Sequence, residues 1–174
     1  MKLNPVKCAF RVSLGKFLGF MVSQRDIKAN PKKVKVILEM TPPRNVKEVQ
    51  RLTGRVAVLN RFVLRATNKC LPFFKTLKRA FTWTNECEAA FQELKCYLSN
   101  PPLLSSSKEG KNLFLYLAVF AMAVSAAFIR EESRIQCHVY YVSQAFQGVE
   151  VKYSCIKKIT FALIVASRKL RPYF

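Results

Sequence analysis

Acidic residues are scarce in this chain. Its 174 residues include 30 Lys and Arg but only 10 Asp and Glu, which gives a formal net charge of +20 at pH 7. Asp26 is the only aspartate and His138 the only histidine. Such a chain is poorly equipped for catalysis by paired carboxylates around metal ions. Its excess of positive charge indicates phosphate backbones or anionic surfaces as partners.

The spacing that binds zinc is also missing. The six cysteines include no Cys-x-x-Cys pair. His138 is adjacent to Cys137 in the sequence and does not have the spacing from a second pair of ligands that a zinc site needs. We therefore expect no metal site and six reduced, mostly buried thiols. The segment after Met1 lacks the long apolar run of a secretory signal. An intracellular location, cytoplasmic or nuclear, is the expectation.

Apolar residues, by contrast, are plentiful. They make up 51% of the chain, which argues against disorder and suits one domain or two small ones. The positive charge is concentrated in residues 1–80, which carry 19 basic against 3 acidic residues, whereas residues 81–174 carry 11 against 7. The basic excess thus belongs to the first half.

Capping residues and periodicity predict the elements of the first half. Residues 7–12 and 16–23 are β-prone and predict two strands that turn at Leu14-Gly15. Helices are predicted to begin at Asn30-Pro31 and at Asn45, where an N-cap residue precedes further helical signals. A third helix is predicted after Trp83-Thr84, because Glu86 and Glu88 in its first turn favour the positive end of the helix dipole. The middle helix carries an apolar stripe of helical period, formed by Val49, Leu52, Val56, Leu59 and Val63. A short apolar element over residues 71–77 follows it.

The second half begins after the polar loop Ser105–Gly110 and contains a long apolar run. The 17 residues Leu113 to Ile129 are either a transmembrane helix at the short edge of span length or two buried strands that fold back near Ala121. Periodicity does not decide between them. A strand over 137–143 and a helix over 155–170 follow. The helix has a predicted buried face of Ile156, Ile159, Leu163, Ala166 and Leu170.

Motifs spread over nearly the whole chain together resemble the pol polyprotein of Ty3/gypsy-type retrotransposons. Those resembling the palm end and thumb of the reverse transcriptase are Lys7-Cys8-Ala9-Phe10, Phe17-Leu18-Gly19-Phe20-Met21-Val22-Ser23, Asn30-Pro31-Lys32-Lys33, Gln50-Arg51-Leu52-Thr53-Gly54-Arg55 and Asn60-Arg61-Phe62. Those resembling the connection and ribonuclease H domain are Phe81-Thr82-Trp83-Thr84, Glu86-Cys87, Ala90-Phe91, Leu94-Lys95, Tyr140-Tyr141-Val142-Ser143, Glu150, Tyr153 and Ser167-Arg168-Lys169-Leu170-Arg171-Pro172-Tyr173-Phe174.

This resemblance implies an α+β fold in three parts. A palm-end hairpin is expected over 1–29, thumb and connection helices over 30–104, and a truncated ribonuclease H-like mixed sheet with one helix over 105–174. Residues 113–119 and 123–130 would be the first two strands of that sheet rather than a membrane span. Because the sheet would stop after its first helix, we also expect an open strand edge and an open apolar face.

The resemblance also implies that catalysis is lost. This family holds two Mg²⁺ ions with clustered carboxylates. Here Ala118 aligns with the first ribonuclease H aspartate and Ile159 with the helix glutamate, and the remaining aspartates would follow Phe174. Glu150 matches a family glutamate that we interpret as a capping residue. We expect a non-catalytic fragment or relic without a cofactor; an active polymerase or ribonuclease H component is the alternative.

The non-catalytic surface of this family contacts nucleic acid, and Phe17-Leu18-Gly19 resembles its primer grip. We expect sequence-independent binding to an RNA/DNA hybrid or a duplex, with other pol segments as further candidate partners. The residues assigned to this binding are Phe17, Leu18, Gly19, Lys28, Lys32, Lys33, Lys35, Lys47, Arg51, Arg55, Arg61 and Arg65.

Overall fold

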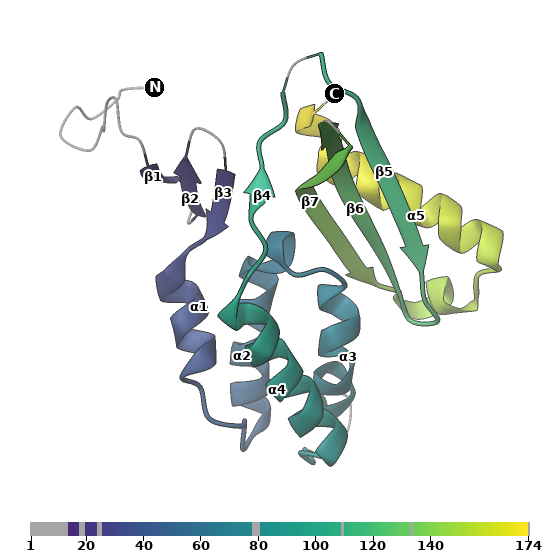
Figure 1. Ribbon diagram of the computed structural model, residues 1–174. Coiled ribbons are helices and arrows are strands. Elements are labelled where there is room, and N and C mark those ends of the chain that lie inside the picture. Colours follow the sequence, from purple (N-terminus) through teal and green to yellow (C-terminus); the bar gives the residue numbers. More distant parts are fainter. Residues whose placement is uncertain are drawn as a thin grey trace, which may run out of the picture.

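The chain folds into a helical half capped by a small sheet and a second half in which one helix covers a larger sheet (Figure 1). The computed structural model describes residues 14–17, 20–23, 26–77, 81–108, 110–132 and 134–173. The first half contains β1 (Leu14–Phe17), β2 (Phe20–Ser23), β3 (Asp26–Ala29), α1 (Pro31–Leu38), α2 (Val46–Val58), η2 (Asn60–Phe62), α3 (Ala66–Leu77), α4 (Asn85–Ser99) and β4 (Leu104–Ser105). The second contains β5 (Leu113–Val119), β6 (Ala123–Glu132), β7 (Ile135–Ala145), η3 (Gly148–Lys152), α5 (Cys155–Leu170) and η4 (Arg171–Tyr173). The predicted α+β class is confirmed.

The N-terminal sheet has the order β1-β2-β3-β4, with antiparallel neighbours. Leu14 and Gly15 lie in β1, whose Phe17 pairs with Phe20 of β2, so the prediction of one strand over 16–23 with a turn at Leu14-Gly15 is wrong. The predicted strand 7–12 lies outside the described residues. Strand β4 returns after α4 and pairs Leu104 with Ile27 of β3. The expected boundary between residues 104 and 105 therefore falls inside a strand that closes the helical half.

The three predicted helix starts are confirmed by their caps. The side chains of Asn30, Asn45 and Thr84 accept hydrogen bonds from backbone N–H groups in the first turns of α1, α2 and α4, at 3.0, 3.0 and 3.3 Å. Each cap satisfies a donor that the helix itself leaves free. All five residues of the predicted apolar stripe are buried: Val49, Leu52, Val56, Leu59 and Val63. The helix itself ends earlier, because α2 stops at Val58.

The short apolar element predicted over 71–77 is the second half of a longer helix. α3 begins at Ala66 and continues through Pro72. A proline inside a helix costs about 3 kcal/mol, and the buried side chains of Cys70 and Phe73 on either side of it provide packing that offsets this cost.

The larger sheet has the order β5-β6-β7, and each described strand is antiparallel to its neighbour, where we expected a mixed sheet. Residues 113–129 form β5 and most of β6, so the alternative of a membrane-spanning helix at this segment is wrong. Among the described helices, none has both the length and the apolar character needed to cross a bilayer.

Helix α5 buries a different face from the one predicted. Ile156, Ile159 and Leu163 of the predicted face are exposed. The residues that it buries are Ala162, Val165, Ala166 and Leu170. Only Ala166 and Leu170 of the predicted face are correct.

The cysteines are less buried than expected. Of the five that the structure describes, Cys70 and Cys87 are buried and Cys137 is half-buried, whereas Cys96 and Cys155 are exposed. The expectation of mostly buried thiols is therefore wrong for these five. Burial raises the pKa of the Cys70 thiol to about 12, so this group stays a neutral core side chain.

Strand β7 joins the two halves. Tyr141 is 4% exposed and belongs to the core of the helical half. The Asn60 side-chain amide donates to the Ser143 carbonyl at 3.4 Å, and the Thr67 backbone N–H donates to the Ser143 hydroxyl at 3.1 Å. Burial, with a smaller effect of nearby Tyr97, raises the pKa of Tyr141 to about 12.

We expect Tyr141 to make stability fall as the pH rises from about 10 to about 12. The phenol has a pKa near 10 in the unfolded chain and about 12 in the fold. Between these two pH values the phenol therefore ionises in the unfolded state before it ionises in the fold, and this ionisation stabilises the unfolded state relative to the folded one. Tyr141→Phe should remove this part of the pH dependence in urea denaturation followed at several pH values. An equally steep decline in the variant would contradict the prediction.

Candidate nucleic-acid interface

Four basic side chains from three elements surround one cavity of about 400 Å³ between β1, α1 and α2. They are Lys16 of β1, Lys32 and Lys33 of α1, and Arg55 of α2. The remaining lining residues are Asn30, Val36 and Val58, so none of the described residues that line the cavity is acidic. Cations gathered without carboxylates repel one another, and an anion between them relieves that repulsion.

Local structure holds these cations in place. Asn30 is buried and caps α1, which places Lys32 and Lys33 in the first turn of that helix. Arg55 lies on α2 and donates from Nη1 to the Met40 sulfur at 3.4 Å. The predicted residues Lys32, Lys33 and Arg55 are thus brought together by the packing of α1 beside α2.

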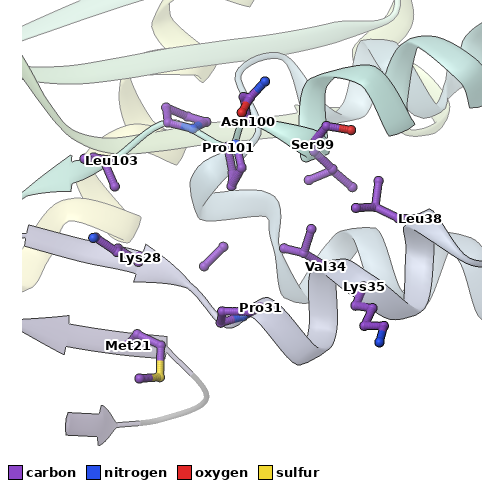
Figure 2. Close-up of a pocket in the computed structure, with 13 residues that line it drawn as sticks. Met21, Lys28, Pro31, Val34, Lys35, Leu38, Ser99, Asn100, Pro101 and Leu103 are labelled. Carbon is purple, nitrogen blue, oxygen red and sulfur yellow. The ribbon is translucent and has the colours of Figure 1, made fainter. Parts of the chain in front are cut away.

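Lys28 and Lys35 lie elsewhere. They line a separate, mostly apolar groove of about 570 Å³ between β3, α1 and the segment after α4. Figure 2 shows Val34 and Leu38 of α1 facing Ser99 and Pro101 across this groove. Lys35 also forms an exposed ion pair with Glu39 at 3.4 Å. Helix α1 therefore divides the predicted cations between two surfaces.

Two predicted cations make contacts within the protein. The Arg61 guanidinium lies 4.6 Å from the centre of the Tyr140 ring and donates from Nη2 to the Tyr173 hydroxyl at 2.7 Å. The Arg65 guanidinium lies 4.9 Å from the Phe120 ring, and its backbone has a positive φ of 55°. Arg61 thus connects η2 with β7 and η4, and Arg65 contacts the turn between β5 and β6.

The other predicted binding residues are placed only in part. Lys47 and Arg51 are exposed on α2. Phe17 ends β1, whereas Leu18 and Gly19 of the primer-grip motif lie outside the described residues. Sequence reasoning missed Lys16, although it directly precedes that motif and is exposed on β1. Its position beside the motif is the signal that could have found it.

The residues at the expected metal positions do not fit Mg²⁺. Ala118 pairs with Ser125 across β5 and β6, and Ile159 is exposed on α5; neither side chain carries a ligating atom. In the part of the chain that the structure describes, no three His, Cys, Asp or Glu residues gather closely enough to hold a metal ion. Glu150 accepts a hydrogen bond from the Gln147 backbone N–H at 2.7 Å, and this capping box confirms its predicted capping role.

We expect Tyr173→Phe to lower the free energy of unfolding by about 1–2 kcal/mol, because it removes the acceptor of a charge-assisted hydrogen bond. Burial raises the pKa of Tyr173 while Arg61 opposes the shift, which is consistent with a neutral phenol beside the guanidinium. Urea denaturation at neutral pH measures the change. Tyr153→Phe at an exposed position is the matched control and should change stability by less than about 0.5 kcal/mol. Equal effects of the two substitutions would contradict a specific Arg61–Tyr173 contact.

Comparison with protein families matches residues 83–174 to the RNase H-like domain found in reverse transcriptase. Among curated proteins, the chain is 26% identical over 186 residues to the Retrovirus-related Pol polyprotein from transposon opus of Drosophila melanogaster, covering 99% of this chain and 18% of that protein. It is 25% identical over 174 residues to the Transposon Tf2-3 polyprotein of Schizosaccharomyces pombe, covering 98% of this chain and 13% of that protein. The chain thus spans less than a fifth of the length of these relatives.

Solved structures show the same fold. The foamy viral protease-reverse transcriptase in complex with dsDNA matches with a TM-score of 0.75 at 20% identity, covering 93% of this chain and 34% of that one. The same viral enzyme in complex with an RNA/DNA hybrid matches with a TM-score of 0.74 at 21% identity, covering 91% and 22%. The match covers most of the chain, including elements that precede the RNase H-like part.

Proposed function

Over residues 83–174 the chain belongs to the family of RNase H-like domains found in reverse transcriptases, and from this membership we propose that it is a non-catalytic, nucleic-acid-binding part of a retrotransposon pol polyprotein. It would bind the sugar–phosphate backbone of an RNA/DNA hybrid or a DNA duplex. The contact surface would be the cationic cavity between α1 and α2.

The observation that carries this proposal is the convergence of Lys16, Lys32, Lys33 and Arg55 on a cavity whose described lining contains no acidic residue. Phosphate oxygens are the anions that such a group of lysines and an arginine recognises, and phosphate contacts supply affinity without sequence information. The net charge of +20 would draw a polyanion toward the chain from a distance.

The choice of ligand is supported by the structural neighbours. The foamy viral enzyme is described in complex with dsDNA and with an RNA/DNA hybrid. Lys47 and Arg51 are exposed on α2, the same helix that carries Arg55. A backbone that enters the cavity could continue along this helix and make further phosphate contacts there.

The proposed role excludes cleavage by this chain alone. Hydrolysis of a phosphodiester by two metal ions needs carboxylates that hold the metals on both sides of the scissile bond. Ala118 and Ile159 offer no oxygen or nitrogen ligand, and Glu150 is committed to the capping box of η3. The chain would therefore position nucleic acid without cutting it.

We expect the triple variant Lys32→Gln, Lys33→Gln and Arg55→Gln to bind a labelled RNA/DNA hybrid about tenfold more weakly or worse. It should also reduce the slope of log affinity against log salt concentration by about 2 to 3, because each phosphate contact contributes about 0.9 to that slope. Fluorescence anisotropy at several salt concentrations measures both quantities.

The matched control removes three exposed cations from the second half, Lys152→Gln, Lys157→Gln and Arg168→Gln, and so changes the net charge equally. It should keep most of the affinity and of the salt slope. If both triple variants lost affinity to the same degree, net charge rather than the cavity would explain the binding. If the unmodified chain did not bind, the proposed function would be wrong.

We expect no cleavage of a labelled RNA/DNA hybrid by the purified chain in Mg²⁺ or in Mn²⁺, because neither key position has a metal ligand. Denaturing gel electrophoresis after long incubation measures the product. Product that elutes with the chain through two different chromatographic steps would refute the argument from Ala118 and Ile159. Such a result would leave the binding prediction untouched.

A further inference from the structure

Thr41 lies in the segment that connects α1 to α2, at the end of these helices that points away from both sheets (Figure 1). From Met40 to Arg44 this segment has no helix or strand, and the side chains of Thr41, Pro42 and Arg44 are exposed. Of the eight prolines in the sequence, only Pro42 follows a serine or a threonine. The chain therefore offers one hydroxyl that is exposed and directly followed by proline.

Two consecutive prolines determine the backbone around this hydroxyl. A proline ring fixes φ near −65°, and a residue that precedes proline is restricted to extended conformations. Thr41 and Pro42 both precede a proline, so this stretch is held extended between two helices. Pro43 is buried and anchors the segment, while Thr41 and Pro42 stay accessible. An extended, accessible segment is the form in which a protein kinase binds its substrate.

The neighbours of Thr41 suit one class of kinase. Proline lacks a backbone N–H, so the residue after Thr41 brings no donor that needs a partner. A kinase whose site offers no acceptor there selects proline, because any other residue would bury an unpaired N–H. Arg44, three residues after Thr41, adds an exposed guanidinium that an anionic group of the kinase can bind.

Two cations already lie beside the residue that precedes Thr41. The Met40 carbonyl accepts a hydrogen bond from Lys95 Nζ at 2.7 Å, and the Met40 sulfur accepts one from Arg55 Nη1 at 3.4 Å. Consecutive Cα atoms are about 3.8 Å apart, so both side chains are within reach of a phosphate on Thr41. Arginine and lysine are the usual partners of such a phosphate.

The acidic residues nearest to Thr41 in the sequence are Glu39 and Glu48, and both have partners. Glu39 pairs with Lys35 at 3.4 Å. Glu48 accepts hydrogen bonds from the Arg44 backbone N–H at 2.7 Å and from the Asn45 amide at 3.1 Å. Arg55 and Lys95 are therefore the side chains best placed to meet a new negative charge on Thr41.

We propose that Thr41 is a phosphorylation site for a proline-directed serine/threonine kinase, and that its phosphate weakens nucleic-acid binding at the cationic cavity. The Thr41 hydroxyl oxygen attacks the γ-phosphorus of ATP, the bond from that phosphorus to the bridging oxygen breaks, and ADP leaves. The hydroxyl proton passes to a base of the kinase. The phosphate then binds Arg55, which also lines the cavity, and repels a polyanion. The effect on binding rests on the proposed function, whereas the modification site does not.

Incubation of the full chain with ATP and a purified cyclin-dependent kinase tests the site. We expect one phosphate per chain, located at Thr41 by tandem mass spectrometry. Pro42→Ala keeps the hydroxyl but adds an N–H, and should slow the modification about tenfold or more. Pro101→Ala is the matched control, since Pro101 follows an asparagine, and should leave the rate unchanged. No phosphate, phosphate on another residue, or equal rates for the two variants would overturn the site.

The contact with Arg55 and Lys95 has a readout that needs no nucleic acid. The second pKa of a free phosphothreonine is about 6, and nearby cations lower it because they favour the dianion. A titration followed by phosphorus NMR should show this lowering in the phosphorylated chain. Arg55→Gln with Lys95→Gln should reverse it, and the control Lys152→Gln with Lys157→Gln should not. Equal values in the two double variants would overturn the contact.

Fluorescence anisotropy with a labelled RNA/DNA hybrid tests the effect on binding. Phosphorylation should weaken the affinity and reduce the salt slope by about 1, because one phosphate contact, that of Arg55, is lost. Thr41→Ala treated with the same kinase should keep the affinity of the unmodified chain. Equal affinity of the phosphorylated and unmodified chains would overturn the inhibition. If the unmodified chain did not bind, the proposed function would fail, and the mass and NMR measurements would still decide the site.

Discussion

The packing of β7 against the helical half is the contact that fixes the two halves of this molecule relative to each other. Successive side chains of a strand point to opposite faces, so β7 can serve two cores. Tyr141 and Ser143 face the helices, where Tyr141 is buried and Ser143 is hydrogen-bonded to residues of η2 and α3. Tyr140 and Val142 belong to the core beneath α5. One face of β7 thus packs against the core of the helical half and the other face against the core beneath α5.

Two arginines are used to join segments of the fold. Arg61 reaches from η2 to Tyr140 and Tyr173, and Arg130 is buried with its Nη1 donating to the Ser106 carbonyl at 2.6 Å. These guanidinium groups join segments distant in the sequence, for which their planar shape and several donors are suited. Around the α1–α2 cavity, Arg55 contacts the Met40 sulfur but also lines the cavity together with Lys16, Lys32 and Lys33. They remain the chain's best candidates for contact with phosphate.

Local signals predicted the helix starts correctly, because a cap depends on residues within one turn of it. The same signals failed where packing between distant segments outweighed them. Pro72 indicated a break, yet α3 continues through it with Cys70 and Phe73 buried. Helix α5 has two apolar faces, and the periodicity of the apolar residues does not determine which of the two is buried against the sheet. The sheet packs against the face that carries Ala162 and Ala166.

Residue identity and short spacing were sufficient to predict the charge, the helix caps, the apolar stripe of α2 and side chains without metal-ligating atoms at Ala118 and Ile159. The sequence also named Lys32, Lys33 and Arg55 as binding residues. The packing of the folded chain places these three around a cavity with Lys16, places Lys28 and Lys35 along another groove, and brings Arg61 into contact with Tyr173. Those outcomes depend on which surfaces meet when segments far apart in the chain pack together, and residue spacing does not encode that.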